Sequence, residues 1–143
     1  MVRYLLEQKK AGRIRHLGFS SHARPETIEQ FVTKYDCFEF CQIQLNYLDA
    51  TLQDARKKYD ILTAHNLPVI VMEPVRGGKL ADLGEAHNAR LKALRPDDSV
   101  ASWAFRYLQG LPNVQIVLSG MTTLEQLQDN LRTFEAPAPL SGA

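Results

Sequence analysis

Four short apolar segments, each followed by a stretch of helical periodicity, constrain the fold of this chain more than any other feature. The segments are Ile14–Ser20, Phe38–Leu45, Val69–Met72 and Val114–Leu118. They are rich in β-branched and aromatic residues, which is typical of strands buried on both faces. Strands that alternate with helices form a parallel sheet with right-handed crossovers. The sequence therefore predicts an α/β fold of four βα units with parallel strands, preceded by a helix.

The helical stretches each carry an apolar stripe and a polar opposite face. The expected helices are Val2–Ala11, Pro25–Tyr35, Thr51–His65, Glu85–Leu94, a helix capped by Asp97 or Asp98 that runs to Leu108, and a helix from Thr122 to Phe134. Two architectures satisfy this order of elements: an open doubly wound sheet, or half of an eight-stranded TIM-type (β/α)₈ barrel. No Gly-x-Gly-x-x-Gly motif follows the first strand. Its absence argues against the dinucleotide-binding type of open sheet.

Length and composition limit the class of protein. A chain of 143 residues is expected to form one domain, with residues 1–135 in the half-barrel and residues 136–143 as a loosely ordered C-terminal tail. The net charge of +1 argues against a nucleic-acid partner. Because no apolar run reaches 18 residues, we expect no membrane contact and a soluble, cytoplasmic protein. Cys37 and Cys41 are too few for a disulfide framework or a metal site.

The stretch Val114–Leu131 is the strongest local candidate for a ligand site. It predicts a strand, a turn and a helix that Thr122 caps, with Glu125 three residues on and leucines along one face. The unpaired amide groups of the first helical turn are a natural place to hold an anion such as a phosphate. Most strand–turn–helix units hold no ligand, so spacing alone leaves both an anion site and an empty turn open.

Ligands gather at the carboxyl ends of parallel strands, and the sequence at these ends is distinctive. The stretches GRIRHLGFS, QIQLNY and VMEPVRGGKL, and LSGM continuing to Asn130, together resemble the second half of an aldo/keto reductase. The resemblance runs from about Leu5 to Phe134, with the four pieces in the family's order. It implies a (β/α)₈ barrel that moves a hydride between NADP(H) and a carbonyl, to which this chain supplies strands five to eight.

The resemblance also implies a set of cofactor-binding residues. One group would bind the nicotinamide end, a second would lie along the pyrophosphate, and a third would hold the adenosine phosphate and the adenine. In that order the groups are Ser20, Ser21, Gln42 and Met72; Glu73, Pro74, Val75, Arg76 and Gly77; and Gly120, Met121, Thr123, Gln126, Asp129 and Asn130. Many relatives hold the 2′-phosphate with a lysine or arginine near Gly120 and Gln126. Neither is present here, so NADP(H) is implied and NAD(H) is possible.

No catalytic residue is assigned. The family's set of Asp, Tyr, Lys and His lies on the first four strands, and His16, His22, His65, Lys79 and Tyr47 do not fall at matching positions. We therefore expect no carbonyl reductase activity from this chain alone, and a small carbonyl substrate only in a full-length parent. The pattern looks most like the branch whose full-length members carry a C-terminal iron–sulfur segment. The two cysteines cannot supply four thiolates, so no cluster is expected.

A half-barrel also suggests a non-catalytic alternative. Four parallel strands alone expose two sheet edges and one apolar face, which a partner must cover. Such a chain could be an interaction module that dimerises through its exposed edges. The expected partner is a second copy of the chain or a missing N-terminal half.

Overall fold

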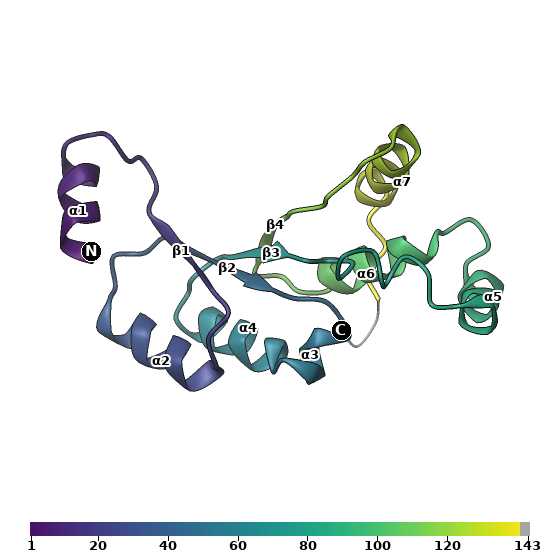
Figure 1. Cartoon of the computed structure of the whole chain (residues 1–143), viewed down its shortest axis with the longest axis horizontal. Coiled ribbons are helices and arrows are strands. Elements are labelled where there is room, and N and C mark those ends of the chain that lie inside the picture. The colour runs from purple at the N-terminus through teal and green to yellow at the C-terminus, as the bar shows by residue number, and fades with distance from the viewer. Residues whose placement is uncertain (141–143) are drawn as a thin grey trace.

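The fold is a four-stranded parallel sheet with α2, α3 and α4 along one face (Figure 1). A computed structural model of the chain describes residues 1–140. The strands β1 (Gly18–Ser21), β2 (Phe40–Gln44), β3 (Val69–Met72) and β4 (Val114–Val117) lie in the order β1-β2-β3-β4. The helices are α1 (Val2–Lys10), α2 (Pro25–Lys34), α3 (Asp49–Leu52), α4 (Ala55–Ala64), α5 (Glu85–Leu94), α6 (Val100–Gln109) and α7 (Leu124–Glu135). The predicted order of four parallel βα units after a helix is confirmed.

The core lies between the two central strands and the helices α2 and α4. Ile43 of β2 and Val71 of β3 are fully buried, and they pack in one cluster with Ile28 of α2 and Leu62 of α4. Alternate residues of the same strands are only half-buried, and Ile116 of β4 is 50% exposed. The expectation of burial on both faces is therefore wrong for this chain. The second face carries both apolar and polar side chains, and the four strands alone do not enclose it.

A close contact on this second face fills part of it from within the chain. The ring of Phe40 lies directly over Gly18, its parallel neighbour in the register of β1 and β2. A Cβ atom at residue 18 would lie 2.2 Å from Cε2 of that ring. The absence of a side chain at Gly18 is what lets the Phe40 ring lie against the backbone of β1.

Several element boundaries differ from the sequence expectation. The first strand begins at Gly18 and not at Ile14, and the second begins at Phe40 and not at Phe38. The expected helix over Thr51–His65 is two helices, because Asp54 adopts a left-handed conformation with φ of 50° between α3 and α4. Short polar side chains such as that of aspartate tolerate this conformation better than most residues.

Two helix caps also differ from the prediction. The cap of α6 is Ser99 and neither aspartate, because the side chain of Asp98 is bonded to Arg106. The cap of α7 is Thr123 and not Thr122: Thr123 Oγ1 accepts from the backbone N–H of Gln126, and the Gln126 side chain accepts from the Thr123 N–H in return. This is a full capping box, one residue later than expected.

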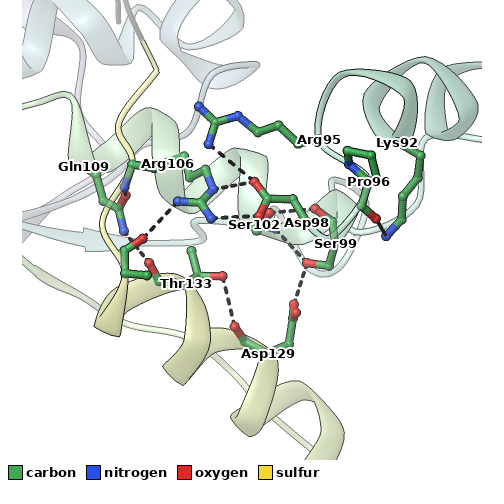
Figure 2. A network of polar contacts seen from close by, with 12 residues as sticks. Lys92, Arg95, Pro96, Asp98, Ser99, Ser102, Arg106, Gln109, Asp129 and Thr133 are labelled. Carbon is green, nitrogen blue, oxygen red and sulfur yellow. Dashed lines mark hydrogen bonds and ion pairs between the residues drawn. The ribbon is translucent and has the colours of Figure 1, made fainter.

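Polar contacts attach α7 to α6 (Figure 2). Arg106 donates from Nε and Nη2 to the two carboxylate oxygens of Asp98, at 2.6 and 2.8 Å, and from Nη1 to the carbonyl of Ala136 at 3.3 Å. Ser99 Oγ donates to the Asp129 carboxylate, and Gln109 Nε2 donates to the carbonyl of Thr133. The Arg106 guanidinium holds the pKa of the Asp98 carboxyl below its ordinary range.

The apolar stripe of α7 is present as predicted but remains exposed. Its members are Leu124, Leu127, Leu131 and Phe134, which are 38–63% exposed. Only the Phe134 ring has an aromatic neighbour, Phe105 of α6, with ring centroids 5.5 Å apart. The helix thus follows the amphipathic pattern of the sequence while its apolar side faces outward.

The two chain ends also make polar contacts. In α1 no residue is buried, and Lys9 pairs with Glu39, which also accepts from His16 Nδ1. The pKa of Glu39 is lowered to about 2, first by the hydrogen bond from Lys9 and then by those from His16 and the Leu17 amide.

The C-terminal tail, expected to be loose over residues 136–143, makes two backbone hydrogen bonds to α6. The Ala138 N–H donates to the Gln109 side chain, and the Leu140 N–H donates to the Arg106 carbonyl. Residues 141–143 of that tail lie outside the described residues. Within residues 1–140, no helix is long and apolar enough to cross a membrane.

Candidate functional site

The loop after β3 has an unusual backbone that shapes the site. Glu73, Arg76, Gly77 and Gly78 all have positive φ angles, of 56°, 49°, 61° and 87°. Two of these are the glycines expected where a chain must adopt the left-handed region. The other two are a glutamate and an arginine, for which this conformation is uncommon. Surrounding contacts must therefore hold the loop in this shape.

A buried polar cluster supplies such contacts. Asn46 and Asp49, both fully buried, lie just after β2. Asn46 Nδ2 donates to the Asp49 carboxylate at 2.7 Å and to the Glu73 carbonyl at 2.9 Å, while Gln44 Nε2 donates to the same carboxylate at 2.7 Å. Arg76 Nε lies 3.3 Å from Asp49 Oδ1, as an ion pair without an aligned hydrogen bond. The end of β2 thus fixes both ends of the turn Glu73–Arg76.

A cavity of about 350 Å³ opens between this loop, α6, the β4–α7 connection and the start of α7. It lies beyond the carboxyl ends of β3 and β4, where parallel α/β folds bind ligands. Eight of the residues that the resemblance implied line it: Glu73, Pro74, Val75, Gly77, Gly120, Met121, Gln126 and Asn130. Residues from two strand ends far apart in the sequence therefore converge on one space.

A second group of expected residues lies on the open face of the sheet. Ser20 is paired in register with Gln42, and Gln42 Nε2 lies 3.9 Å from Met72 Sδ. These three side chains come from three adjacent strands. The Ser21 side chain makes a local hydrogen bond, in which its Oγ accepts from the Ala23 N–H at 3.1 Å.

Three further expected residues belong neither to the cavity wall nor to this open-face group. Arg76 is paired with Asp49, and Thr123 is occupied as the cap of α7. Asp129 accepts from Ser99 on α6 and pairs with Arg132 on its own helix. Each has a structural partner that explains its position.

The sequence reasoning missed several lining residues. These are Gly78, Ala81, Ala101, Phe105, Leu118, Ser119 and Thr122. Gly78, Ser119 and Thr122 lie at the strand ends that the sequence analysis had already singled out. Their position next to predicted cofactor residues could have identified them. Ala101 and Phe105 belong to the apolar stripe of α6, and no local pattern separates cavity-lining residues from core residues on such a stripe.

The cavity can be tested against the cofactor that the resemblance implies. A Cβ atom built at Gly78 or Gly120 would meet no atom within 4 Å, so both residues border open space. The walls combine apolar side chains with the Ser119 hydroxyl and backbone groups, and ligand pockets for nucleotide-sized molecules have this mixture. The residues present therefore fit one part of a dinucleotide. Within residues 1–140, no three His, Cys, Asp or Glu residues group as a metal site would require.

The tyrosines near the strand ends are not tuned for proton transfer. Burial raises the pKa of Tyr47 and of Tyr107, whereas a tyrosine that donates its proton near neutral pH needs a lowered pKa. The Tyr47 hydroxyl is buried and has no hydrogen-bond partner. Neither residue is therefore assigned a catalytic role.

The chain is similar to known proteins in sequence. The model of the aldo/keto reductase family matches residues 1–141. An oxidoreductase of Bacillus subtilis strain 168, the uncharacterized YqkF, is 26% identical over 91% of this chain and 48% of its own length. The chain thus spans about half the length of this relative.

Solved structures agree with the family model. The holo form of an aldo-keto reductase from Bacillus halodurans is 25% identical, with a TM-score of 0.71 over 94% of this chain and 49% of its own. An aldo-keto reductase from Klebsiella pneumoniae in complex with NADPH is 18% identical, with a TM-score of 0.77 over 99% of this chain and 49% of its own. The four βα units are half of the TIM barrel of these enzymes, and the chain belongs to the aldo/keto reductase family.

Proposed function

We propose that this chain is the nicotinamide-cofactor-binding half of an aldo/keto reductase-type oxidoreductase. The observation that carries the proposal is the convergence of eight expected cofactor residues, from the ends of β3 and β4 and from α7, on one cavity. In this assignment the loop from Glu73 to Gly78 and the turn from Leu118 to Thr122 bind the dinucleotide. Ser20, Gln42 and Met72 on the open sheet face orient its nicotinamide end.

The cofactor would supply hydride chemistry toward a carbonyl, and these residues would bind and orient it. We propose that the chain alone does not reduce carbonyls, because burial raises the pKa of Tyr47 and also that of Tyr107, where it outweighs the lowering effect of Arg56. The chain should show no NADPH or NADH oxidation with a panel of small aldehydes. A rate that disappears on replacing one residue of this chain would overturn this part of the proposal.

Calorimetry tests the binding role directly. NAD⁺ or NADP⁺ should bind the 143-residue chain with a Kd below about 1 mM, or on the order of −4 kcal/mol. Gly120→Leu should abolish this binding, because it fills the cavity at a residue whose φ is not positive. Ala64→Leu introduces the same leucine side chain at an exposed position of α4. This variant is the control and should bind the dinucleotide normally. Unaltered binding to Gly120→Leu would rule out the cavity as the site.

A specific observation favours a second candidate, the interaction module. Ile116 and Leu118 at β4 and the apolar stripe of the α7 helix that follows are large apolar side chains left exposed. At the opposite end, the outer edge of β1 has no neighbouring strand among the described residues. Two copies, each presenting β4 to the partner's β1, would give eight parallel strands. We therefore propose a homodimer as the state that covers this face.

Light scattering distinguishes this state from a monomer. A dimer mass is expected at tens of micromolar, and Leu127→Glu together with Leu131→Glu should convert it to monomer. Leu94→Glu on α5, which is 71% exposed and lies away from the β4 end, is the matched control. A monomer mass for the unaltered chain would refute the homodimer and leave a separate N-terminal half as the partner to test.

A further inference from the structure

The charge of the cavity wall is one-sided. Of the described residues that line it, only Glu73 carries a charged side chain. Its carboxylate lies close enough that Oε2 would be 3.8 Å from a Cβ atom at Gly77. A carboxylate accepts a hydrogen bond from a sugar hydroxyl and repels a phosphate.

The nearest arginine in the sequence is committed elsewhere. Arg76 lies between two lining residues, yet its Nε is paired with the Asp49 carboxylate. Asp49 is fully buried, so moving Arg76 to a ligand would leave a buried carboxylate without its cation, which is costly. Lys79 is exposed and does not line the cavity.

The first turn of α7 has few free donors for an anion. The Gln126 side chain accepts from the N–H groups of Thr122 and Thr123, and Thr123 Oγ1 accepts from the Gln126 N–H. Glu125 adds a carboxylate at this end of the helix. Its pKa is lowered by a hydrogen bond from its own backbone N–H and then by the Thr123 hydroxyl. Glu125 therefore adds a negative charge at the helix N-terminus, where an additional phosphate would otherwise be favoured.

We infer that the cavity selects a dinucleotide without a 2′-phosphate, so that this chain binds NAD(H) in preference to NADP(H). The inference rests on the proposed cofactor-binding function and specifies its cofactor. A 2′-phosphate adds close to two negative charges, which need a cation or several free donors. This cavity offers two carboxylates nearby and no uncommitted cation among its described lining residues. A ribose 2′-hydroxyl suits the same surroundings, because the Ser119 hydroxyl beside Gly120 can accept its hydrogen bond.

Parallel calorimetric titrations of NAD⁺ and NADP⁺ into the 143-residue chain test the inference. NAD⁺ should bind about tenfold more tightly or better, since one unfavourable charge contact near a protein surface has at least this effect. Glu73→Gln and Glu125→Gln should each narrow the ratio between the NADP⁺ and NAD⁺ dissociation constants, with the double variant closing most of the gap. Glu135→Gln, at the far end of α7, is the charge-matched control and should leave the ratio unchanged.

The outcomes separate this inference from the function on which it rests. Equal or tighter binding of NADP⁺ to the unaltered chain would overturn the cofactor preference while supporting the cofactor site. A preference for NAD⁺ that neither glutamate variant narrows would overturn the electrostatic cause. Absence of binding by both dinucleotides at about 1 mM would overturn the proposed function, and the inference with it.

Discussion

The centre of the sheet and its two flanks are held together by different interactions. At the centre, β2 and β3 bury fully apolar side chains against α2 and α4. At the flanks, α1 and α7 stand beyond β1 and β4 (Figure 1), and their attachments are mainly polar. Lys9 and His16 contact Glu39 at the N-terminal flank. The hydrogen bonds of Arg106 with the Ala136 carbonyl and of Ser99 with Asp129 attach α7.

This contrast shows which parts of the half-barrel bury their apolar side chains without a partner. The central units are complete, because the apolar stripes of α2 and α4 already pack against the same face of β2 and β3. The flanking helix α7 has an equally apolar stripe that finds no surface to cover, so side-chain hydrogen bonds determine its position. Polar contacts fix orientation but contribute less to stability than apolar burial does. The flanks are therefore the part that a partner would reorganise.

The largest effect is expected from the centre. Ile43→Ala removes a fully buried side chain of β2 that packs in the core with β3, α2 and α4. It should lower the free energy of unfolding by about 2–5 kcal/mol. Leu124→Ala on α7, 63% exposed, should change it by less than about 0.5 kcal/mol. Urea unfolding followed by circular dichroism measures both. Equal losses would show that α7 is packed against a surface in solution.

The polar attachment of α7 comes next. Arg106→Met leaves the Asp98 carboxylate, 16% exposed, with only the more distant Arg95 guanidinium at 3.6 Å, and should destabilise the chain by about 2–3 kcal/mol. Arg132→Met breaks the arginine–aspartate pair within α7, but Arg132 is 71% exposed and the loss should stay below about 1 kcal/mol. Thermal unfolding of the two variants under identical conditions compares them. Similar losses would contradict the role given to Arg106.

A smaller effect separates two adjacent threonines. Thr123→Ala removes the cap of α7 and should cost about 1 kcal/mol. Thr122→Ala removes only a hydroxyl contact to Gln126 at 3.2 Å and should cost less. Helical content near the unfolding midpoint reports both changes. The reverse order would restore Thr122 as the cap that the sequence predicted.

The smallest effect is a dependence on pH at the N-terminal flank. The folded chain holds the pKa of Glu39 at about 2 instead of 4.5, so ionised Glu39 stabilises the fold above pH 4.5. This contribution is lost as the pH falls from 4.5 through 2. Glu39→Gln should therefore be less stable than the unaltered chain at pH 7 and equal to it near pH 2. Unfolding at both values, with the exposed Glu85→Gln as control, checks the sign; a difference that persists at pH 2 would exclude the ion pairs as its source.

Much of the fold was predictable because it depends on local patterns. Apolar runs, helical periodicity and strand-end punctuation predicted four parallel βα units, and the resemblance correctly assigned them to half of a barrel. Caps and boundaries were less predictable, because Asp98 had two possible roles and only the buried Arg106 decides between them. Burial of β4 on both faces was predicted from composition alone, and composition cannot reveal whether neighbouring strands are present.

The parts of the candidate site that depend on local sequence were predictable, and the parts that depend on contacts between distant segments were not. Strand ends and the glycines Gly77 and Gly120 identified most of the cavity wall. The sequence could not reveal that Arg76 turns to Asp49, since that pair depends on two loops meeting after β2 and β3. The contribution of Phe105 was hidden for a similar reason, because one helix face serves both core and cavity.

The contact between Gly18 and Phe40 has a consequence for substitution tolerance. Residue 18 is only half-buried and has an ordinary backbone conformation, so exposure and φ alone would class it as permissive. The aromatic ring above it reverses that expectation, because even alanine would collide with the ring. In a library of variants, position 18 should accept larger residues only together with a smaller residue at 40. Paired changes of this kind would identify the two strands as neighbours from variation alone.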